Sequence, residues 1–172
     1  MPFITPGLAL LRAAPLLSST SYITFTLSED IYLRPFGNFR SDLRPEANRL
    51  IPAYKARWFP PALAMIFVLY PLSIGTSIAN LLLRGSRKLD LSGGLGYNRR
   101  TSGYLYIAGA MFSALHFAFG PNDLAILKRI GDEDKDNEAA MADLAVMNRI
   151  RGLVADFPSW ICYFAAFFYA IS

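Results

Sequence analysis

The 172-residue chain has one cysteine, one histidine and few charged residues. The single cysteine, Cys162, excludes an intrachain disulfide and any metal site built from several thiolates. The single histidine, His116, excludes a multi-histidine site for a metal ion or a haem. Charged residues make up only 17% of the chain, whereas an ordinary soluble domain has about 25%. We therefore expect a protein with no tightly bound metal or other cofactor.

Signatures of soluble enzymes and of nucleic-acid binding are also absent. There is no Walker loop and no HExxH motif, and residues 93–96 (GGLG) do not fit the dinucleotide-binding fingerprint. The acidic run at residues 131–140 lacks the spacing of an EF-hand loop. The net charge of +4 does not indicate nucleic acid, because the basic residues lie between apolar runs, where anionic lipid headgroups attract them.

The sequence does contain long apolar runs. Hydrophobic residues make up 53% of the chain, and the mean hydropathy is +0.31. Residues 59–83 carry no charge, and this run exceeds the roughly 20 residues that a helix needs to cross a bilayer. Residues 8–28, 101–122 and 152–171 reach a similar length if Arg12 and Asp156 are included. The 59–83 run shows no polar face at helical spacing, unlike a helix of a soluble protein.

These segments predict an all-α fold, a four-helix transmembrane bundle in which residues 1–172 form one integral membrane domain. Both termini are then on the same side. A cleaved signal peptide is the alternative for the first segment, but no clear cleavage site follows it, which favours a retained helix. Lysine and arginine are more numerous in the first and third connections, which places those connections in the cytosol. We expect the endoplasmic reticulum membrane as the location.

Polar side chains within the apolar segments are candidates for a functional site, because a charge in hydrocarbon costs about 2.5–3.5 kcal/mol. His116 and Asp156 are the candidate catalytic residues, with His116 as the base. Asn148 and Arg151 lie three residues apart and share a helix face. Asp156 lies about 140° around a regular helix from Arg151. We therefore expect each to find a partner on another helix, and a bound phenolate or enolate is a possible counter-ion for Arg151.

The alternative for these side chains is structural. His116 can be an interhelical hydrogen-bonding group, and Asp156 can be solvated at the membrane interface. The segment before residue 59 has the same two interpretations. Tyr54, Lys55 and Arg57 suit an interfacial belt, but Lys55 and Arg57 could also face inwards and bind a phenolate oxygen.

Three short motifs follow one another along the chain. They are an aromatic and basic entry to the second span at 54–61 (YKARWFPP), Pro121, Asn122 and Leu124 at the end of the third span, and Asn148 with Arg151 at the start of the fourth. On four predicted spans, this order resembles the small four-helix fungal membrane proteins related to anthrone oxygenases. The resemblance implies that Pro121 and Asn122 cap the third helix and face Asn148 and Arg151. Pro60 and Pro61 are expected in the first turn of the second helix.

Members of that family oxidise anthrones with O₂ and without a recognised cofactor, because a deprotonated phenolic substrate reacts with O₂ itself. The resemblance implies a membrane monooxygenase of fungal secondary metabolism that acts on a hydrophobic, polyketide-like aromatic substrate. The implied substrate-binding residues are Asn122, Asn148, Arg151, Tyr54, Lys55 and Arg57.

The chain lacks the family's threonine between Pro121 and Asn122, and it has Lys55 and Arg57 where a histidine is common. Two other hypotheses therefore stay open. One is a membrane cyclase or isomerase that uses acid–base chemistry without O₂. The other is a non-catalytic membrane scaffold that holds a soluble enzyme through its charged connections.

Overall fold

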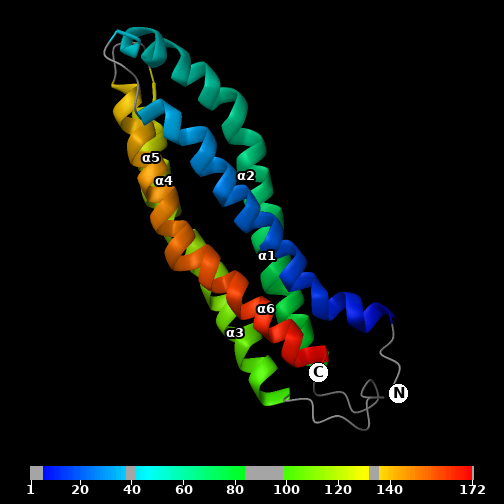
Figure 1. The fold of residues 1–172 in the computed structure, drawn as a ribbon. Helices are drawn as coiled ribbons and strands as arrows, with labels where there is room; N and C mark the ends of the chain where they lie inside the picture. Colours follow the sequence, from blue (N-terminus) through cyan, green and yellow to red (C-terminus); the bar gives the residue numbers. More distant parts are fainter. Residues whose placement is uncertain (1–5, 38–41, 84–98, 132–135, 172) are drawn as a thin grey trace.

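The computed structural model describes residues 6–37, 42–83, 99–131 and 136–171, and these residues form four helical rods (Figure 1). The rods run alternately in opposite directions, and the described chain begins and ends at the same end of the bundle. No strand occurs within the described ranges. The expected all-α, four-helix fold is confirmed.

Three of the rods are long and apolar enough to cross a membrane, namely Arg44–Leu83, Arg100–Arg129 and Asn137–Ala170. This composition indicates an association with the membrane. The first rod is α1 (Pro6–Leu33) and is not among the three, so its crossing of the membrane stays a prediction. Residues 84–98 and 132–135, which belong to the second and third connections between the predicted segments, lie outside the described residues.

The low hydropathy of α1 has a structural explanation. Its buried face carries hydroxyl groups that bond to other helices: Ser18 lies 2.6 Å from Ser73, and Tyr22 donates to Ser159 across 2.6 Å. Hydroxyls on its outer face bond to the carbonyl oxygen four residues earlier, as Thr24 does to Thr20 at 2.8 Å. These hydroxyl groups therefore have partners without water, as polar groups within a membrane helix require.

The second rod, α2 (Arg44–Leu83), follows the 3₁₀ turn η1 (Arg34–Gly37) and begins well before residue 59. Pro60 and Pro61 therefore lie inside the helix, and their expected place in its first turn is wrong. Helix formation extends back to residue 44 because residues in its first turns, such as Ile51, are buried against the other rods. Neighbouring helices allow a membrane helix to contain prolines.

The third rod consists of α3 (Arg99–His116), the 3₁₀ turn η3 (Phe117–Phe119) and α4 (Gly120–Arg129). It continues past Asn122, so the expected helix cap at Pro121 and Asn122 is wrong. Pro121 lies in the first turn of α4, where its missing N–H breaks no helical hydrogen bond. The short 3₁₀ turn connects the two helices.

The fourth rod consists of α5 (Asn137–Arg151), the π-helical turn η4 (Gly152–Asp156) and α6 (Phe157–Ile171). Asp136 caps α5 by accepting a hydrogen bond of 3.1 Å from the backbone N–H of Ala139. α5, η4 and α6 follow one another without a break, so the helix begins well before the predicted fourth segment at residue 152.

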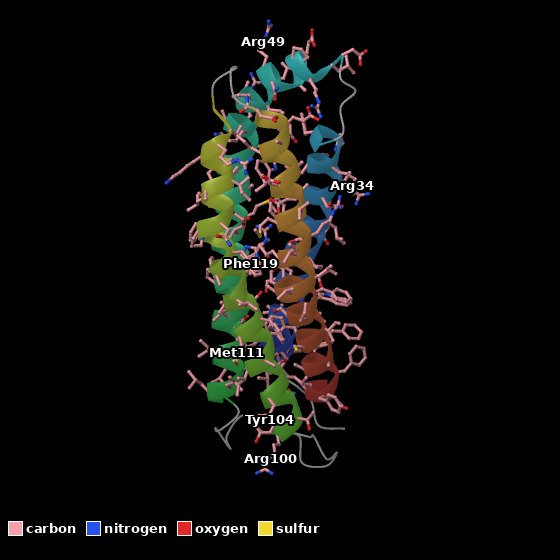
Figure 2. The ribbon with its side chains drawn as sticks, turned by 90° about the vertical axis from the view of Figure 1, so that its left-hand side faces the viewer. Arg34, Arg49, Arg100, Tyr104, Met111 and Phe119 are labelled. Atoms are coloured by element: carbon pink, nitrogen blue, oxygen red, sulfur yellow. The ribbon has the colours of Figure 1, made fainter. Side chains whose placement is uncertain are left out.

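Two apolar clusters hold the ends of the bundle together. One of them, here called the upper cluster, lies where α2 begins. The other, here called the lower cluster, joins α3 to α6. Figure 2 shows side chains with nitrogen and oxygen atoms gathered toward the end that carries Arg49, while carbon-only side chains dominate around Met111. The upper cluster is formed by Leu33, Ile51, Leu127, Ile130, Ala140, Met141, Leu144 and Ala145. The lower cluster is formed by Tyr106, Tyr163, Ala166 and Ala170.

The close approach of α3 and α6 depends on Gly109. A Cβ atom at this position would lie 2.6 Å from the ring of Tyr163, which is fully buried. We expect Gly109→Ala to lower the free energy of unfolding by about 1–3 kcal/mol, because the ring must shift within a packed interface. Thermal unfolding in detergent micelles measures the change. Gly75→Ala is the control, since its Cβ would meet nothing within 4 Å; equal destabilisation by both substitutions would contradict the prediction.

Candidate functional site

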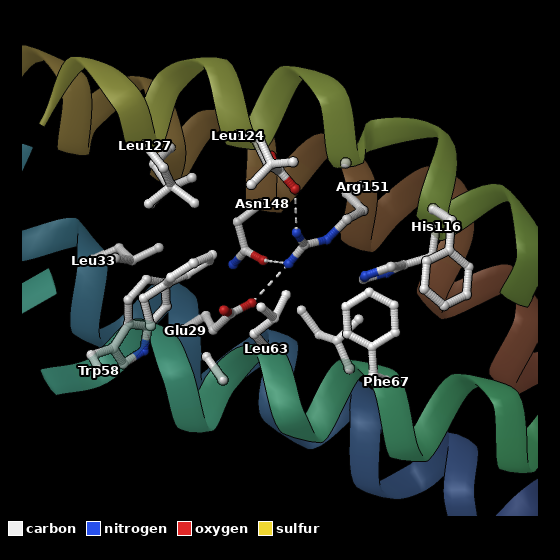
Figure 3. Close-up of a pocket in the computed structure, with 17 residues that line it drawn as sticks. Glu29, Leu33, Trp58, Leu63, Phe67, His116, Leu124, Leu127, Asn148 and Arg151 are labelled. Carbon is white, nitrogen blue, oxygen red and sulfur yellow. Dashed lines mark hydrogen bonds and ion pairs between the residues drawn. The ribbon is translucent and has the colours of Figure 1, made fainter. Parts of the chain in front are cut away.

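A cavity of about 250 Å³ lies between the four rods, with its long wall on α2 (Figure 3). Most of its lining is apolar, and its polar groups converge from three of the rods. This combination is usual for a small-molecule site. The apolar lining includes Leu33, Trp58, Phe59, Leu63, Ile66, Phe67, Phe117, Leu124, Leu127 and Leu144. The polar lining consists of Glu29, His116, Asp123, Asn148 and Arg151.

His116 and Asp156, the two candidate catalytic residues, form a hydrogen-bonded pair. The Nδ1 atom of His116 lies 2.9 Å from Oδ1 of Asp156. Asp156 is fully buried and also accepts hydrogen bonds from Thr26 (2.8 Å) and from the hydroxyl of Tyr70 (2.9 Å). A carboxylate in this position favours the imidazole tautomer that carries its proton on Nδ1. The lone pair of a neutral His116 is then on Nε2.

The Nε2 atom is the reactive position of this pair. His116 lines the cavity, and no residue in the described ranges forms a hydrogen bond with Nε2. The ring of Tyr70 packs on the imidazole with a centroid distance of 3.8 Å and fixes its orientation. The pair can therefore exchange a proton with a molecule in the cavity, as a general base or acid does.

Arg151 forms the centre of the polar end of the cavity. It donates to Asp123 (2.7 Å), to Glu29 (2.8 Å) and to the side-chain oxygen of Asn148 (2.6 Å). The predicted shared face of Asn148 and Arg151 is confirmed by this last bond, and the expected partners on other helices are confirmed too. Glu29 and Asp123 are counter-ions of Arg151 within the protein.

The π-helical turn changes the relation between Arg151 and Asp156. A regular α-helix would separate their side chains by about 140°. The turn holds more residues than an α-helical turn, and the Nε atom of Arg151 lies 4.0 Å from Oδ2 of Asp156. The expectation that these two residues belong to separate faces is therefore wrong. π-Turns within α-helices are frequent at functional sites.

The polar end of the cavity has more carboxyl groups around it than guanidinium groups. Three carboxylates, Glu29, Asp123 and Asp156, surround the single guanidinium of Arg151. An anionic ligand would meet these carboxylates at close range, which disfavours a phenolate there. Within the described ranges, no group of three histidine, cysteine, aspartate or glutamate side chains is arranged to hold a metal ion.

Four of the predicted substrate-binding residues do not line the cavity. Asn122 is exposed on α4, and the next residue, Asp123, takes the inward position. Tyr54 packs on Phe36 with a centroid distance of 4.9 Å, as part of the rim of the upper cluster. Arg57 is exposed, as in an interfacial belt.

Lys55 has a structural contact instead. Its Nζ atom donates to the backbone carbonyls of Leu127, at 3.1 Å, and of Ile130. These carbonyls belong to the end of α4, where a cation compensates the helix dipole. Lys55 thereby ties α2 to the end of α4.

Sequence reasoning missed Glu29, Asp123, Thr26 and Tyr70. Glu29 and Asp123 lie at the edges of apolar runs, where a carboxylate indicates the end of a membrane span. A signal was present for α1, because Tyr22, Thr26 and Glu29 follow one another at spacings of four and three and so share a helix face. Only the packing of α1 against η4 shows that this face meets Asp156 and Arg151.

Two fungal proteins are similar to the chain over nearly its whole length. Epoxidase pydX of Acremonium sp is 29% identical over 178 aligned positions, which cover 96% of this chain and 97% of pydX. Epoxidase gkaX of Penicillium citrinum is 31% identical over 166 positions, which cover 95% of this chain and 96% of gkaX. No family model matches the chain. No solved structure matches it.

Proposed function

This chain belongs to the family of the fungal epoxidases pydX and gkaX, and we propose that it is a membrane-embedded oxygenase of secondary metabolism that epoxidises an alkene in a hydrophobic substrate. The observation that carries the proposal is the cavity in which His116, held by Asp156, stands beside apolar walls. The apolar walls would hold the alkene and exclude water. The Nε2 atom of His116 would supply or remove the proton that oxygen chemistry requires.

Electron balance distinguishes this reaction from anthrone oxidation. Epoxidation by O₂ places one oxygen atom in the alkene and releases the other as water, which takes two electrons and two protons from a reductant such as a reduced nicotinamide or flavin. Conversion of a CH₂ group to a ketone by O₂ also releases water but needs no outside electrons. The carboxylate excess around Arg151 disfavours a phenolate, so we place anthrone-type oxygenation of an aromatic polyketide second.

Acid–base chemistry without O₂ is the third possibility, because the His116–Asp156 pair would serve a cyclase or isomerase equally well. A scaffold role has no comparable observation in its favour. The two enzymatic alternatives and the proposed epoxidation predict different products, so one set of assays separates them.

The test uses the protein in lipid vesicles, hydrophobic candidate intermediates that contain an alkene, isotopically labelled O₂ and mass spectrometry. We expect a product with one labelled oxygen atom whose formation requires the reductant. A labelled product that forms without any reductant indicates the anthrone-type reaction. A product of unchanged mass indicates an isomerase or cyclase. If none of the intermediates is altered, with or without O₂ and reductant, the enzymatic proposal is overturned.

A further inference from the structure

The helices α2 and α4 border the cavity on opposite sides and meet toward its charged end, where Lys55 bonds to the last carbonyls of α4. Figure 3 shows Leu63 and Phe67 on α2 opposite Leu124 on α4. α4 packs mainly against α5, and α2 packs mainly against α1, α3 and α5, so the side of the cavity between α2 and α4 has no extensive helix–helix interface.

Side chains on this side are apolar and exposed. Phe67 is 60% exposed and Leu124 is 49% exposed, and both also line the cavity. Exposed apolar residues continue along the same rods, with Val68 on α2 and Leu115 on α3. In a membrane protein such a surface faces the acyl chains of the lipid. The cavity thus borders the lipid through residues that belong to both surfaces.

The other directions are closed by contacts. Toward the charged end, Lys55 bridges α2 to the last carbonyls of α4. Toward the centre of the bundle, Phe67 contacts Phe117 with a centroid distance of 6.1 Å, and Tyr70 packs on His116. The open stretch between α2 and α4 is therefore short, and it leads to the His116 end of the cavity.

We propose that the substrate enters sideways from the bilayer, through an opening between α2 and α4 that is bounded by Leu63, Phe67 and Leu124. This inference rests on the proposed function in one respect, that the ligand is a hydrophobic molecule dissolved in the membrane. An apolar ligand concentrates in lipid and reaches His116 without crossing water. Leu124 and Phe67 then form an entrance that selects for narrow, apolar chains.

The test blocks the entrance with a bulky chemical label on a cysteine, which is called the plug below. In a Cys162→Ala background, Leu124→Cys is assayed before and after reaction with a bulky, membrane-permeant maleimide. Met111→Cys is the matched control, because Met111 is 68% exposed on the same rod and does not line the cavity. We expect the label at position 124 to lower kcat/KM for a membrane-dissolved substrate at least about tenfold by slowing entry. The label at position 111 should leave kcat/KM unchanged.

A second measurement does not depend on turnover. Trp160→Phe leaves Trp58, which lines the cavity, as the only tryptophan. A spin-labelled fatty acid in the vesicles should quench the fluorescence of Trp58. Because contact quenching requires access to the indole, the label at position 124 should remove at least half of this quenching. The label at position 111 should not reduce it. Equal quenching with either plug, or a normal kcat/KM with position 124 labelled, overturns the entrance.

The two measurements separate the two proposals. The label at position 124 could remove the quenching of Trp58 in a protein that turns over no candidate substrate. This result supports the entrance and counts against the proposed function. Normal epoxidation that the plug does not affect supports the function and rejects the entrance.

Discussion

Replacing His116 with asparagine is expected to lower kcat by about 10²- to 10⁴-fold, the usual contribution of a general acid or base. Asparagine retains a donor near the position of Nδ1 and can keep a bond to Asp156, which otherwise loses one of its three hydrogen-bonding partners. It lacks an equivalent of Nε2. The loss of rate should therefore occur in a folded protein, and kcat is measured by product formation in vesicles.

His116→Ala serves as the comparison. It should reduce turnover as strongly and also destabilise the fold by about 1–3 kcal/mol, because Asp156 is left with an unmet acceptor in the interior. Added imidazole that enters the vacated space should restore part of the rate of His116→Ala, a result that a purely structural histidine would not give. Full activity of His116→Asn would show that His116 is not the base, and Asp156 would become the next candidate.

Removing Arg151 is expected to have the largest effect on stability. The family resemblance implied that Arg151 binds substrate, but the guanidinium is buried between Glu29 and Asp123. Arg151→Met leaves these carboxylates without a counter-ion, which costs about 3–5 kcal/mol for a broken buried pair. Little folded protein should accumulate, as measured by size-exclusion chromatography and thermal unfolding in detergent.

A neutral triple variant tests this explanation. Arg151→Met combined with Glu29→Gln and Asp123→Asn removes the charges together, and the free energy of unfolding should return to within about 1–2 kcal/mol of the original. Activity of the folded triple variant then shows whether the polar end binds substrate. Normal folding of the single variant Arg151→Met would contradict the structural role that we assign to the cluster.

The apolar runs predicted the helices well but not their limits. Residues 59–83 were recognisable because no charge interrupts them, whereas 44–58 mix charges with apolar residues and become helical through burial of residues such as Ile51 against the upper cluster. In the sequence, the Gly120–Pro121 step indicates the end of a helix. In the structure the 3₁₀ turn before it and the packing of α4 on α5 carry the rod through.

The site was predictable where a polar residue interrupts an apolar run. His116 and Asp156 were found in this way, whereas Asn148 and Arg151 were found through the motif at the start of the fourth span. The structure brings all four together. Their pairing was not predictable, because it depends on contacts between distant helices and on the π-turn. Glu29 is the clearest example, since only the fold places it beside Arg151.

The π-turn sets the rotation of α6 relative to α5. If the same five residues, Gly152–Asp156, formed a regular α-helix, each would advance the chain by more than it does in the wide turn, and α6 would be rotated out of its present orientation. Asp156 and the groups that α6 directs at α3, Tyr163 among them, would then lose their positions together, although no residue of the site had been replaced. The π-turn therefore accommodates one extra residue while the groups of α5 and α6 keep facing the same site.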